Sequence, residues 1–284
     1  MDRTKLTIIL VSYFSFTHLK RLTKQLKKYK FIIIENSREK LVKEYFIKKK
    51  NIRVIFPKKN LGYGKGNNLG ISLSKTNYCL ILNPDTSFKE KNIQSIFNYI
   101  KKIDDFGILL PRLKNNKSIK IFHKKKYDFV KVNYKCIGQD LASGCCMLIN
   151  KKRVKRISFF DKKIFLYKEE TDLIKRCNEK NINTFLLKNS EVMHFGSKSY
   201  QKKIASEFEI FRNWHWMWSN FYFYKKHFGF NYALIKFSKK LISSFIKKEI
   251  FFLFKKPQYK IYEARFNGLF NSIKNKPSSY RMSF

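Results

Sequence analysis

Acidic residues are scarce in this chain. Its 284 residues include 20 Asp and Glu against 62 Lys and Arg, which gives a formal net charge of +42. Hydrophobic residues nevertheless make up 44% and aromatic residues 17% of the chain. A disordered polycation combines high charge with low hydrophobicity, so this composition excludes one. It predicts instead a folded protein of one large or two small domains with a strongly positive surface.

Cysteines and long apolar runs are also few. The five cysteines are an odd number without C-x-x-C spacing, which argues against a disulfide framework and favours reduced thiols. The uncharged runs 141–150 and 213–224 are shorter than the roughly 18–20 apolar residues that span a bilayer. The first residues show no secretory signal. We therefore expect a cytoplasmic protein without a membrane-spanning helix.

Apolar runs alternate with helical patterns over the first hundred residues. Four runs predict buried strands: residues 6–13, 31–34, 52–56 and 78–82. Three patterns predict helices: residues 17–29, 39–49 and 93–103. A Gly/Asn-rich loop at 60–70 is expected to lead into a further helix that ends near residue 74. This alternation predicts an α/β fold with a parallel sheet and helices on both faces.

The second half of the chain changes in composition near residue 205. Before it, residues 142–149 predict a strand, 168–180 a helix and 184–187 a short strand that leads to His194. After it, residues 211–230 contain ten aromatic side chains, and 233–254 fits an amphipathic helix with interspersed lysines. We therefore predict two domains, residues 1–204 and a helical, aromatic-rich extension over 205–284.

The loop between Asn60 and Gly70 holds four of the ten glycines in the chain. Its spacing matches neither the dinucleotide fingerprint nor the P-loop. Glycines before a helix permit a tight turn, and they also let a phosphate approach the helix N-terminus. Both interpretations stay open from the residues alone.

Asp85 and His194 are candidates for a metal site. Asn83-Pro84-Asp85 directly follows the predicted strand 78–82, and ligands of parallel sheets bind beyond the carboxyl ends of strands. A carboxylate there can hold a divalent ion on a diphosphate, and His194 could complete the site. The alternatives are an ordinary helix cap for Asp85 and a structural role for His194.

Four of the 20 carboxylates fall within 12 residues, at Asp161, Glu169, Glu170 and Asp172. Crowded carboxylates raise one another's pKa, which suits a general base. An acidic first turn that complements a helix dipole explains the cluster equally well.

Taken in order, these segments resemble the family 2 glycosyltransferases of the GT-A fold, in particular the rhamnosyltransferase-like branch, over residues 6 to 200. Residues 8–13 look like the opening strand, 33–37 like "vvDNaS", and 60–70 like "NxGfgxgnNxGi". Residues 80–86 look like "llLNPDt", the form that the D-x-D metal motif takes in this branch. Residues 143–149, 160–173 and 194–199 resemble "sGaxmlir", "FDexfFlYxEDxDL" and "HxgxxS". Order and spacing together make the resemblance specific.

The resemblance implies a GT-A nucleotide-diphospho-sugar transferase fold, with a Rossmann-like, mostly parallel sheet. It implies inverting transfer of a sugar, with rhamnose as the first candidate, from a nucleotide-diphosphate sugar to a glycan or lipid-linked acceptor in cell-surface polysaccharide biosynthesis. Mg²⁺ or Mn²⁺ would be held by Asp85 and His194. Glu170 would be the base, with Glu169 beside it. The implied donor-binding residues are Ser12, Tyr13, Glu35, Gly64, Asn68, Asn83, Ser143 and Gly144.

Three positions depart from the family pattern. Glu35 and Glu170 each replace the usual Asp, and Phe14 stands where Asn is common. The two Glu keep the charge but are one methylene longer, and a base displaced by about 1 Å can cost roughly 10²-fold in rate. These changes leave weak activity or an altered acceptor geometry open.

Two functions from other classes also stay open. The charge and the aromatic run are consistent with a nucleic-acid-binding protein, but no RNP, KH or helix-turn-helix signature is present. The 233–254 helix is consistent with a non-catalytic peripheral membrane protein. We expect no nucleic-acid partner, and we expect this helix to bind an anionic membrane surface on the cytoplasmic face of the inner membrane.

Overall fold

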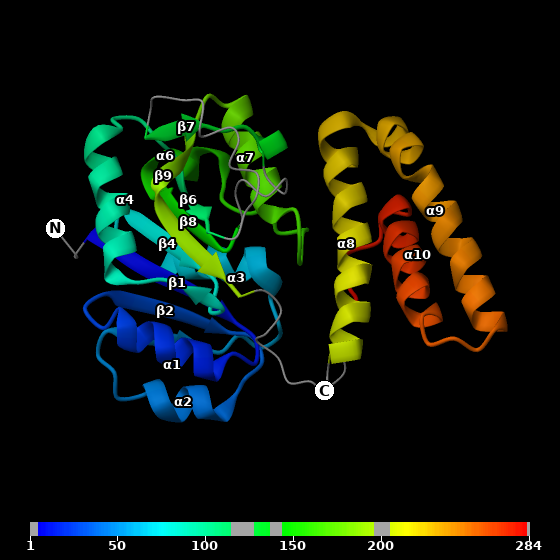
Figure 1. The fold of residues 1–284 in the computed structure, drawn as a ribbon, viewed down its shortest axis with the longest axis horizontal. Helices are drawn as coiled ribbons and strands as arrows, with labels where there is room; N and C mark the ends of the chain where they lie inside the picture. Colours follow the sequence, from blue (N-terminus) through cyan, green and yellow to red (C-terminus); the bar gives the residue numbers. More distant parts are fainter. Residues whose placement is uncertain (1–4, 115–127, 137–143, 196–204, 283–284) are drawn as a thin grey trace. The chain divides into compact units, whose positions relative to one another are not determined.

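The computed structural model describes residues 5–114, 128–136, 144–195 and 205–282. The chain divides into two compact units (Figure 1). The first unit comprises Met1–Asp161 and Glu170–Tyr200, and the second comprises Lys162–Glu169 and Gln201–Phe284. This division differs from the two predicted sequence ranges, because Lys162–Glu169 belongs to the second unit. There the Ser219 hydroxyl donates a 2.7 Å hydrogen bond to the Leu166 carbonyl.

Half of the sheet in the first unit is parallel, as predicted. Its strands have the order β3-β2-β1-β4. They span Leu6–Ser12 (β1), Lys30–Glu35 (β2), Ile52–Ile55 (β3) and Tyr78–Leu82 (β4). The intervening helices span Phe16–Gln25 (α1), Lys40–Phe46 (α2) and Gly62–Leu73 (α3), and β4 is followed by Glu90–Lys102 (α4). The register pairs Ser12 with Glu35, so the carboxyl ends of β1 and β2 lie side by side.

The other half of the sheet is mixed. β8 pairs antiparallel with β4 and with β6, β6 runs parallel to β9, and β9 pairs antiparallel with β5 and β7. These strands span Thr86–Ser87 (β5), Ile108–Leu113 (β6), Phe129–Lys131 (β7), Cys146–Asn150 (β8) and Thr184–His194 (β9). The short helices are η2 (Tyr134–Cys136), α6 (Lys151–Val154) and η3 (Lys155–Ile157), followed by α7 (Glu169–Glu179). β9 is longer than the predicted strand and includes His194, which was expected to follow it.

Side chains along the strands alternate between two apolar layers. On β1, Ile8 and Leu10 join the layer that packs against α1, α2 and α4, and Ile9 joins the layer on the opposite face, against α3, α6 and α7. This period of two is expected for a strand that is buried on both faces. The predicted α/β fold with helices on both faces of the sheet is therefore confirmed.

The glycine-rich run forms a helix where a loop was expected. α3 begins at Gly62, whose φ is 75°, and continues through Gly70. A Cβ on Gly70 would overlap Ile9 Cγ2, and a Cβ on Gly66 would lie 3.0 Å from both γ carbons of Val11. These two glycines therefore let α3 pack directly on β1.

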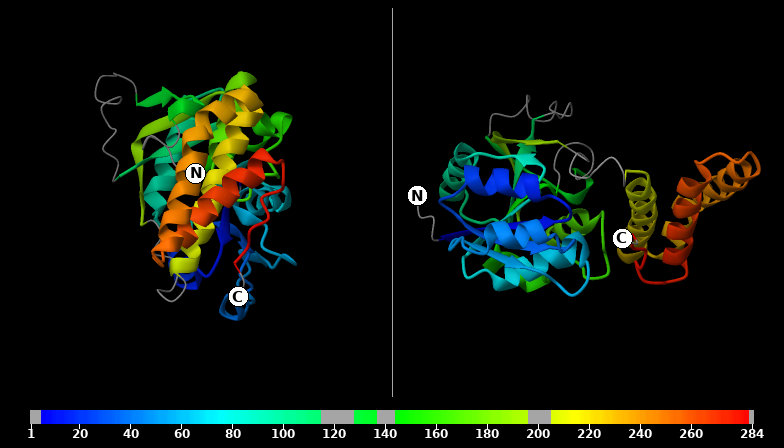
Figure 2. Two further views of the ribbon diagram at one scale, coloured as in Figure 1. Left: turned by 90° about the vertical axis from the view of Figure 1, so that its right-hand side faces the viewer. Right: turned by 90° about the horizontal axis from the view of Figure 1, so that it is seen from below.

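The second unit contains three long helices (Figure 2): α8 (Ala205–Phe228), α9 (Phe230–Leu253) and α10 (Tyr259–Ile273). Gly229, with φ of 89°, connects α8 to α9. Two apolar clusters hold the helices together, one around Phe221 and Phe237 and one around Trp214 and Trp218. None of the described helices combines the length and hydropathy needed to cross a membrane.

A buried histidine fixes the end of the chain to α8. The ring nitrogens of His215 lie 2.9 Å from Ser278 Oγ and 3.0 Å from the Tyr280 carbonyl oxygen. Burial lowers the pKa of His215 to about 3, although the hydrogen bond to Tyr280 opposes the shift. The imidazole is therefore neutral at physiological pH.

Candidate functional site

The carboxyl ends of β1 and β2 present two buried polar atoms. The backbone N–H of Asn36 donates a 2.9 Å hydrogen bond to the Ser12 carbonyl and ties the ends together. Ser12 Oγ and Glu35 Oε2 are both buried, and neither has a hydrogen-bond partner within the described ranges. Buried polar atoms are normally paired, so a pair of orphans at a strand edge indicates that a ligand completes their bonds.

Glu35 is held in place by the residues that follow β2. Its Oε1 accepts a 2.8 Å hydrogen bond from the Ser37 backbone N–H and another from the Ser37 hydroxyl. Burial raises the pKa of Tyr13, and the charge of Glu35 raises it further. Burial likewise raises the pKa of Glu39, again with a contribution from Glu35. Glu35 therefore adds to the effect of burial on both neighbouring side chains.

Phe14 explains why Asn is common at this position. Its φ is 49°, in the left-handed region that Asn adopts at lower cost than Phe. Its backbone N–H donates a 2.9 Å hydrogen bond to Ser37 Oγ. Phe14 thus adopts the left-handed conformation and is fixed there by Ser37.

The structure brings the two predicted metal ligands together. Asp85 Oδ1 lies 3.0 Å from His194 Nε2, although the residues are 109 positions apart. β5 and β9 produce this contact, because Thr86 pairs with His194 and the Phe195 N–H donates a 2.9 Å bond to the Asp85 carbonyl. Asp85 is 7% exposed, and the nearby Asn83 Oδ1 is buried without a described hydrogen-bond partner.

Arg21, on α1, is a site residue that the sequence analysis missed. Its Nη2 donates hydrogen bonds of 3.2 Å to the Pro84 carbonyl and 2.7 Å to the Thr86 carbonyl, on either side of Asp85. Its guanidinium carbon lies 5.2 Å from the centre of the Phe195 ring. Burial lowers the pKa of Arg21, and the charge of Asp85 opposes part of that shift. Arg21 therefore contacts the segments that carry both predicted metal ligands.

The acidic cluster separates into residues with different surroundings. Asp172 is fully buried and binds Arg176 at 2.8 Å, and Arg176 also donates to the carbonyls of residues 157–159. Glu169, the first residue of α7, is buried as well. Glu170 is only partly buried. Asp172 thus has a structural role, and Glu170 is the more accessible carboxylate.

Gly144 lies against Glu170. A Cβ on Gly144 would come within 3.3 to 3.4 Å of three side-chain carbons of Glu170, so glycine leaves room for the carboxylate arm. The Tyr63 hydroxyl, from α3, donates a 2.5 Å hydrogen bond to the Gly144 carbonyl. Tyr63 was also missed by the sequence analysis. The neighbouring Ser143, predicted to face the sugar, lies outside the described residues.

Asn68 has both ends of its amide engaged. Its Nδ2 donates a 2.8 Å hydrogen bond to the Phe160 carbonyl, and its Oδ1 accepts a 2.9 Å bond from the Phe160 N–H. Asn68 therefore fixes the segment that precedes α7. Gly64 is buried in the first turns of α3. The predicted nucleotide contacts of Asn68 and Gly64 stay predictions.

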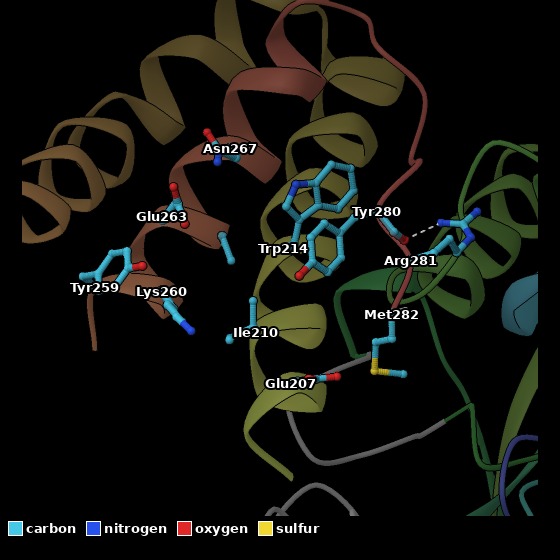
Figure 3. Close-up of a pocket in the computed structure, with 11 residues that line it drawn as sticks. Glu207, Ile210, Trp214, Tyr259, Lys260, Glu263, Asn267, Tyr280, Arg281 and Met282 are labelled. Carbon is cyan, nitrogen blue, oxygen red and sulfur yellow. Dashed lines mark hydrogen bonds between the residues drawn. The ribbon is translucent and has the colours of Figure 1, made fainter. Parts of the chain in front are cut away.

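A separate pocket of about 310 Å³ lies within the second unit, between α8, α10 and the end of the chain (Figure 3). The Trp214 and Tyr280 rings stack beside it, with centroids 5.8 Å apart. Burial raises the pKa of Tyr280, and the charges of Glu207 and Glu263 raise it further. The pocket contains none of the predicted site residues.

The sheet, the Asn-Pro-Asp turn and the carboxylate-bearing helix together define a GT-A fold. The model of the glycosyl transferase family 2 matches residues 7–158, more than half of the chain, and the chain belongs to this family. A mannosyltransferase from Pyrobaculum calidifontis, solved with GDP-Man and Mn²⁺, superposes with a TM-score of 0.57 at 9% identity. That alignment covers 96% of this chain and 88% of the mannosyltransferase, and it supports the fold.

Two archaeal proteins are similar in sequence. The chain is 27% identical over 197 residues to the low-salt glycan biosynthesis hexosyltransferase of Haloferax volcanii. This match covers 63% of each protein, so it spans less than two thirds of the length of the hexosyltransferase. The chain is also 25% identical over 231 residues to a glycosyltransferase of Methanocaldococcus jannaschii named as uncharacterized, covering 74% of this chain and 77% of that protein.

Proposed function

We propose that this protein transfers a sugar from a nucleotide-diphosphate sugar to an acceptor hydroxyl with inversion at the anomeric carbon. The observation that carries the proposal is the Asp85–His194 pair, which lies at the same edge of the sheet as the orphan oxygens of Ser12 and Glu35. Family membership favours this enzyme over the nucleic-acid-binding and non-catalytic membrane alternatives.

The nucleotide half of the donor fits the ends of β1 and β2. Ser12 Oγ and Glu35 Oε2 offer hydrogen-bonding capacity to a ribose or base, and Tyr13 adds an aromatic ring beside them. Glu35 replaces the usual Asp of the family, and its two bonds from Ser37 fix the longer side chain.

Asp85 and His194 fit a divalent cation, because carboxylate oxygen and imidazole nitrogen both ligate Mn²⁺ and Asp85 ligates Mg²⁺ well. The described residues contain no group of three or more His, Cys, Asp or Glu side chains placed to hold a metal. The two residues therefore suit an ion that is shared with the donor diphosphate. When bound there by Asp85 and His194, such an ion would stabilise the charge of the leaving nucleoside diphosphate. The mannosyltransferase of similar fold was solved with Mn²⁺.

Glu170 is the proposed general base. Its carboxylate would accept the proton of the acceptor hydroxyl while that oxygen bonds to the anomeric carbon and the bond to the diphosphate breaks. Gly144 lies against the Glu170 side chain, and the Tyr63 hydroxyl donates a hydrogen bond to the Gly144 carbonyl. Glu169 and Asp172 are less suited, because both are buried.

For the donor sugar, rhamnose is our first candidate, because the Asn-Pro-Asp form of the metal motif resembles that branch. The acceptor is proposed to be a glycan or lipid-linked glycan of a cell-surface polysaccharide. The glycan biosynthesis hexosyltransferase of H. volcanii supports this class of acceptor.

A thermal-shift screen of nucleotide sugars with Mn²⁺, followed by an assay for nucleoside diphosphate release, tests the proposal. A donor at 100 times its Kd should stabilise the fold by about 2.7 kcal/mol through mass action. The Tm of the wild type should rise with one or a few donors. In Asp85→Asn, the part of this rise that depends on Mn²⁺ should be lost. No shift and no release with a broad donor panel would contradict the proposed function.

A further inference from the structure

α9 is apolar on two opposite sides. One side is buried against its neighbours through Ala233 and Phe237. The opposite side carries Ile235, Ile242, Ile246 and Leu253, which are 77%, 58%, 48% and 75% exposed. Successive spacings of seven, four and seven residues place these four side chains on one line along the helix. We call this line the outer stripe.

The outer stripe is part of a larger apolar surface. Of the eighteen exposed large hydrophobic side chains in the described ranges, twelve lie between residues 228 and 254. Phe252, in the last turn of α9, and Phe254, directly after α9, add to this surface at 61% and 71% exposure. A contiguous exposed patch of this kind marks an interaction surface, because isolated exposed hydrophobics are scattered over ordinary surfaces.

Lysines outnumber acidic residues along this segment. Between Gly229 and Lys256 the chain has seven lysines and a single acidic residue, Glu249, which forms a 2.8 Å ion pair with Lys248. Lys239 and Glu249 lie on the two sides of the outer stripe, each about 40° from it around the helix, and the other lysines of α9 lie about 100° or more away. The outer stripe itself is therefore apolar, and the excess of positive charge lies beyond its edges.

This combination selects an anionic lipid surface. An interfacial helix buries an apolar face at the headgroup boundary while its lysines meet anionic lipids, each contributing about 1 kcal/mol. A second copy of the chain would bring together two segments that each carry an excess of lysines, and like charges repel. A nucleic-acid backbone would use the lysines but would leave the stripe in water.

We propose that the outer stripe of α9 binds an anionic phospholipid membrane, attracted by the excess of lysines in the same segment, with α9 parallel to the membrane plane. The proposal does not depend on the transfer reaction, because it rests on the second unit alone.

Vesicle flotation with the full chain tests this surface. The wild type should float with vesicles of phosphatidylcholine and phosphatidylglycerol, and less with phosphatidylcholine alone. Ile235→Ser/Leu253→Ser should bind the anionic vesicles at least about tenfold more weakly, because two exposed anchors are lost. The matched control is Leu41→Ser/Ile47→Ser, which removes two side chains of 53% and 69% exposure from the first unit. It should bind like the wild type.

Three results would overturn the proposal. The first is wild-type vesicle binding by Ile235→Ser/Leu253→Ser. The second is equal loss in both variants, which would show a general effect of surface hydrophobicity. The third is an absence of binding to the anionic vesicles by the wild type. If the wild type is then a dimer that the stripe variant dissociates in sedimentation, a second copy is the occupant. Circular dichroism and transfer to a soluble acceptor, both expected to be unchanged, verify that the variants are folded.

Discussion

The two units of this protein differ in the residue types that indicate their function. In the first unit, the sheet is covered on both faces and the informative side chains are a few carboxylates near strand ends. In the second unit, the informative side chains are abundant lysines and apolar residues exposed on α9. The net charge of +42 therefore says little about the reaction, which we assign to the scarce acids. Changes in one unit should leave the function of the other intact.

The largest expected effect comes from the proposed base. Glu170→Gln should lower kcat by roughly 10²- to 10⁴-fold, because the acceptor hydroxyl loses its proton acceptor. Donor affinity should stay within about twofold. The matched control is Glu179→Gln on the same helix, which breaks an ion pair between a half-exposed carboxylate and Lys175. Retained turnover in Glu170→Gln would remove Glu170 from this role.

A slightly smaller effect is expected at the metal site. Asp85→Asn should reduce transfer on the order of 10²- to 10³-fold, because an ion worth several kcal/mol of charge stabilisation is held less well. EDTA should stop the wild-type reaction, and added Mn²⁺ should restore it. Asp105→Asn, at a surface carboxylate paired with Arg153, is the control. Full activity in EDTA would exclude the metal roles of Asp85 and His194.

Arg21 should tune the metal site without touching the donor. Arg21→Lys keeps a charge but loses the two-carbonyl contact around Asp85, so we expect about 10- to 100-fold weaker Mn²⁺ activation. The measurement is the Mn²⁺ concentration at half-maximal rate, compared with Lys24→Ala on the same helix. Unchanged Mn²⁺ dependence with only a lower Tm would make Arg21 purely structural.

Near neutral pH the smallest effect is a pH dependence of the stability of the second unit. His215 has a pKa of about 3 when folded and about 6.5 when unfolded, so the unfolded chain binds the additional proton between these values. Stability contributed by neutral His215 is present above pH 6.5 and is lost as the pH falls toward 3, by at most about 1.4 kcal/mol per pH unit. His215→Gln should flatten this slope in urea titrations. An equally steep slope in the variant would assign the effect to other groups.

Much of the first unit followed from the sequence, because continuous apolar runs such as 6–13 are typical of strands buried on both faces. The bounds of β6 were not predicted, because Pro111 and Arg112 interrupt its apolar run. The structure accommodates them with a register shift between these two residues, where β6 pairs with β9. Asn60–Gly70 was expected to be a loop, because its glycines disfavour helices in isolation. Contact with Ile9 and Val11 requires glycine there.

Site residues that directly follow a predicted strand could be predicted from the sequence. Site residues that bind backbone atoms could not. Asp85 stood out because it follows β4 directly. Arg21 did not, because it binds the backbone carbonyl oxygens of Pro84 and Thr86. Every residue has such an oxygen, so the residue types do not reveal the contact. Exposure of the outer stripe was also hidden, since the sequence of α9 shows apolar residues on both sides without showing which side is covered.

The most direct test of the division between the units is to measure transfer and anionic vesicle binding for the same two variants. We predict that Glu170→Gln loses transfer to a soluble acceptor and keeps vesicle binding, whereas Ile235→Ser/Leu253→Ser keeps transfer and loses vesicle binding. Loss of both properties in either variant, in protein that is folded by circular dichroism, would contradict the separation of chemistry and membrane attachment.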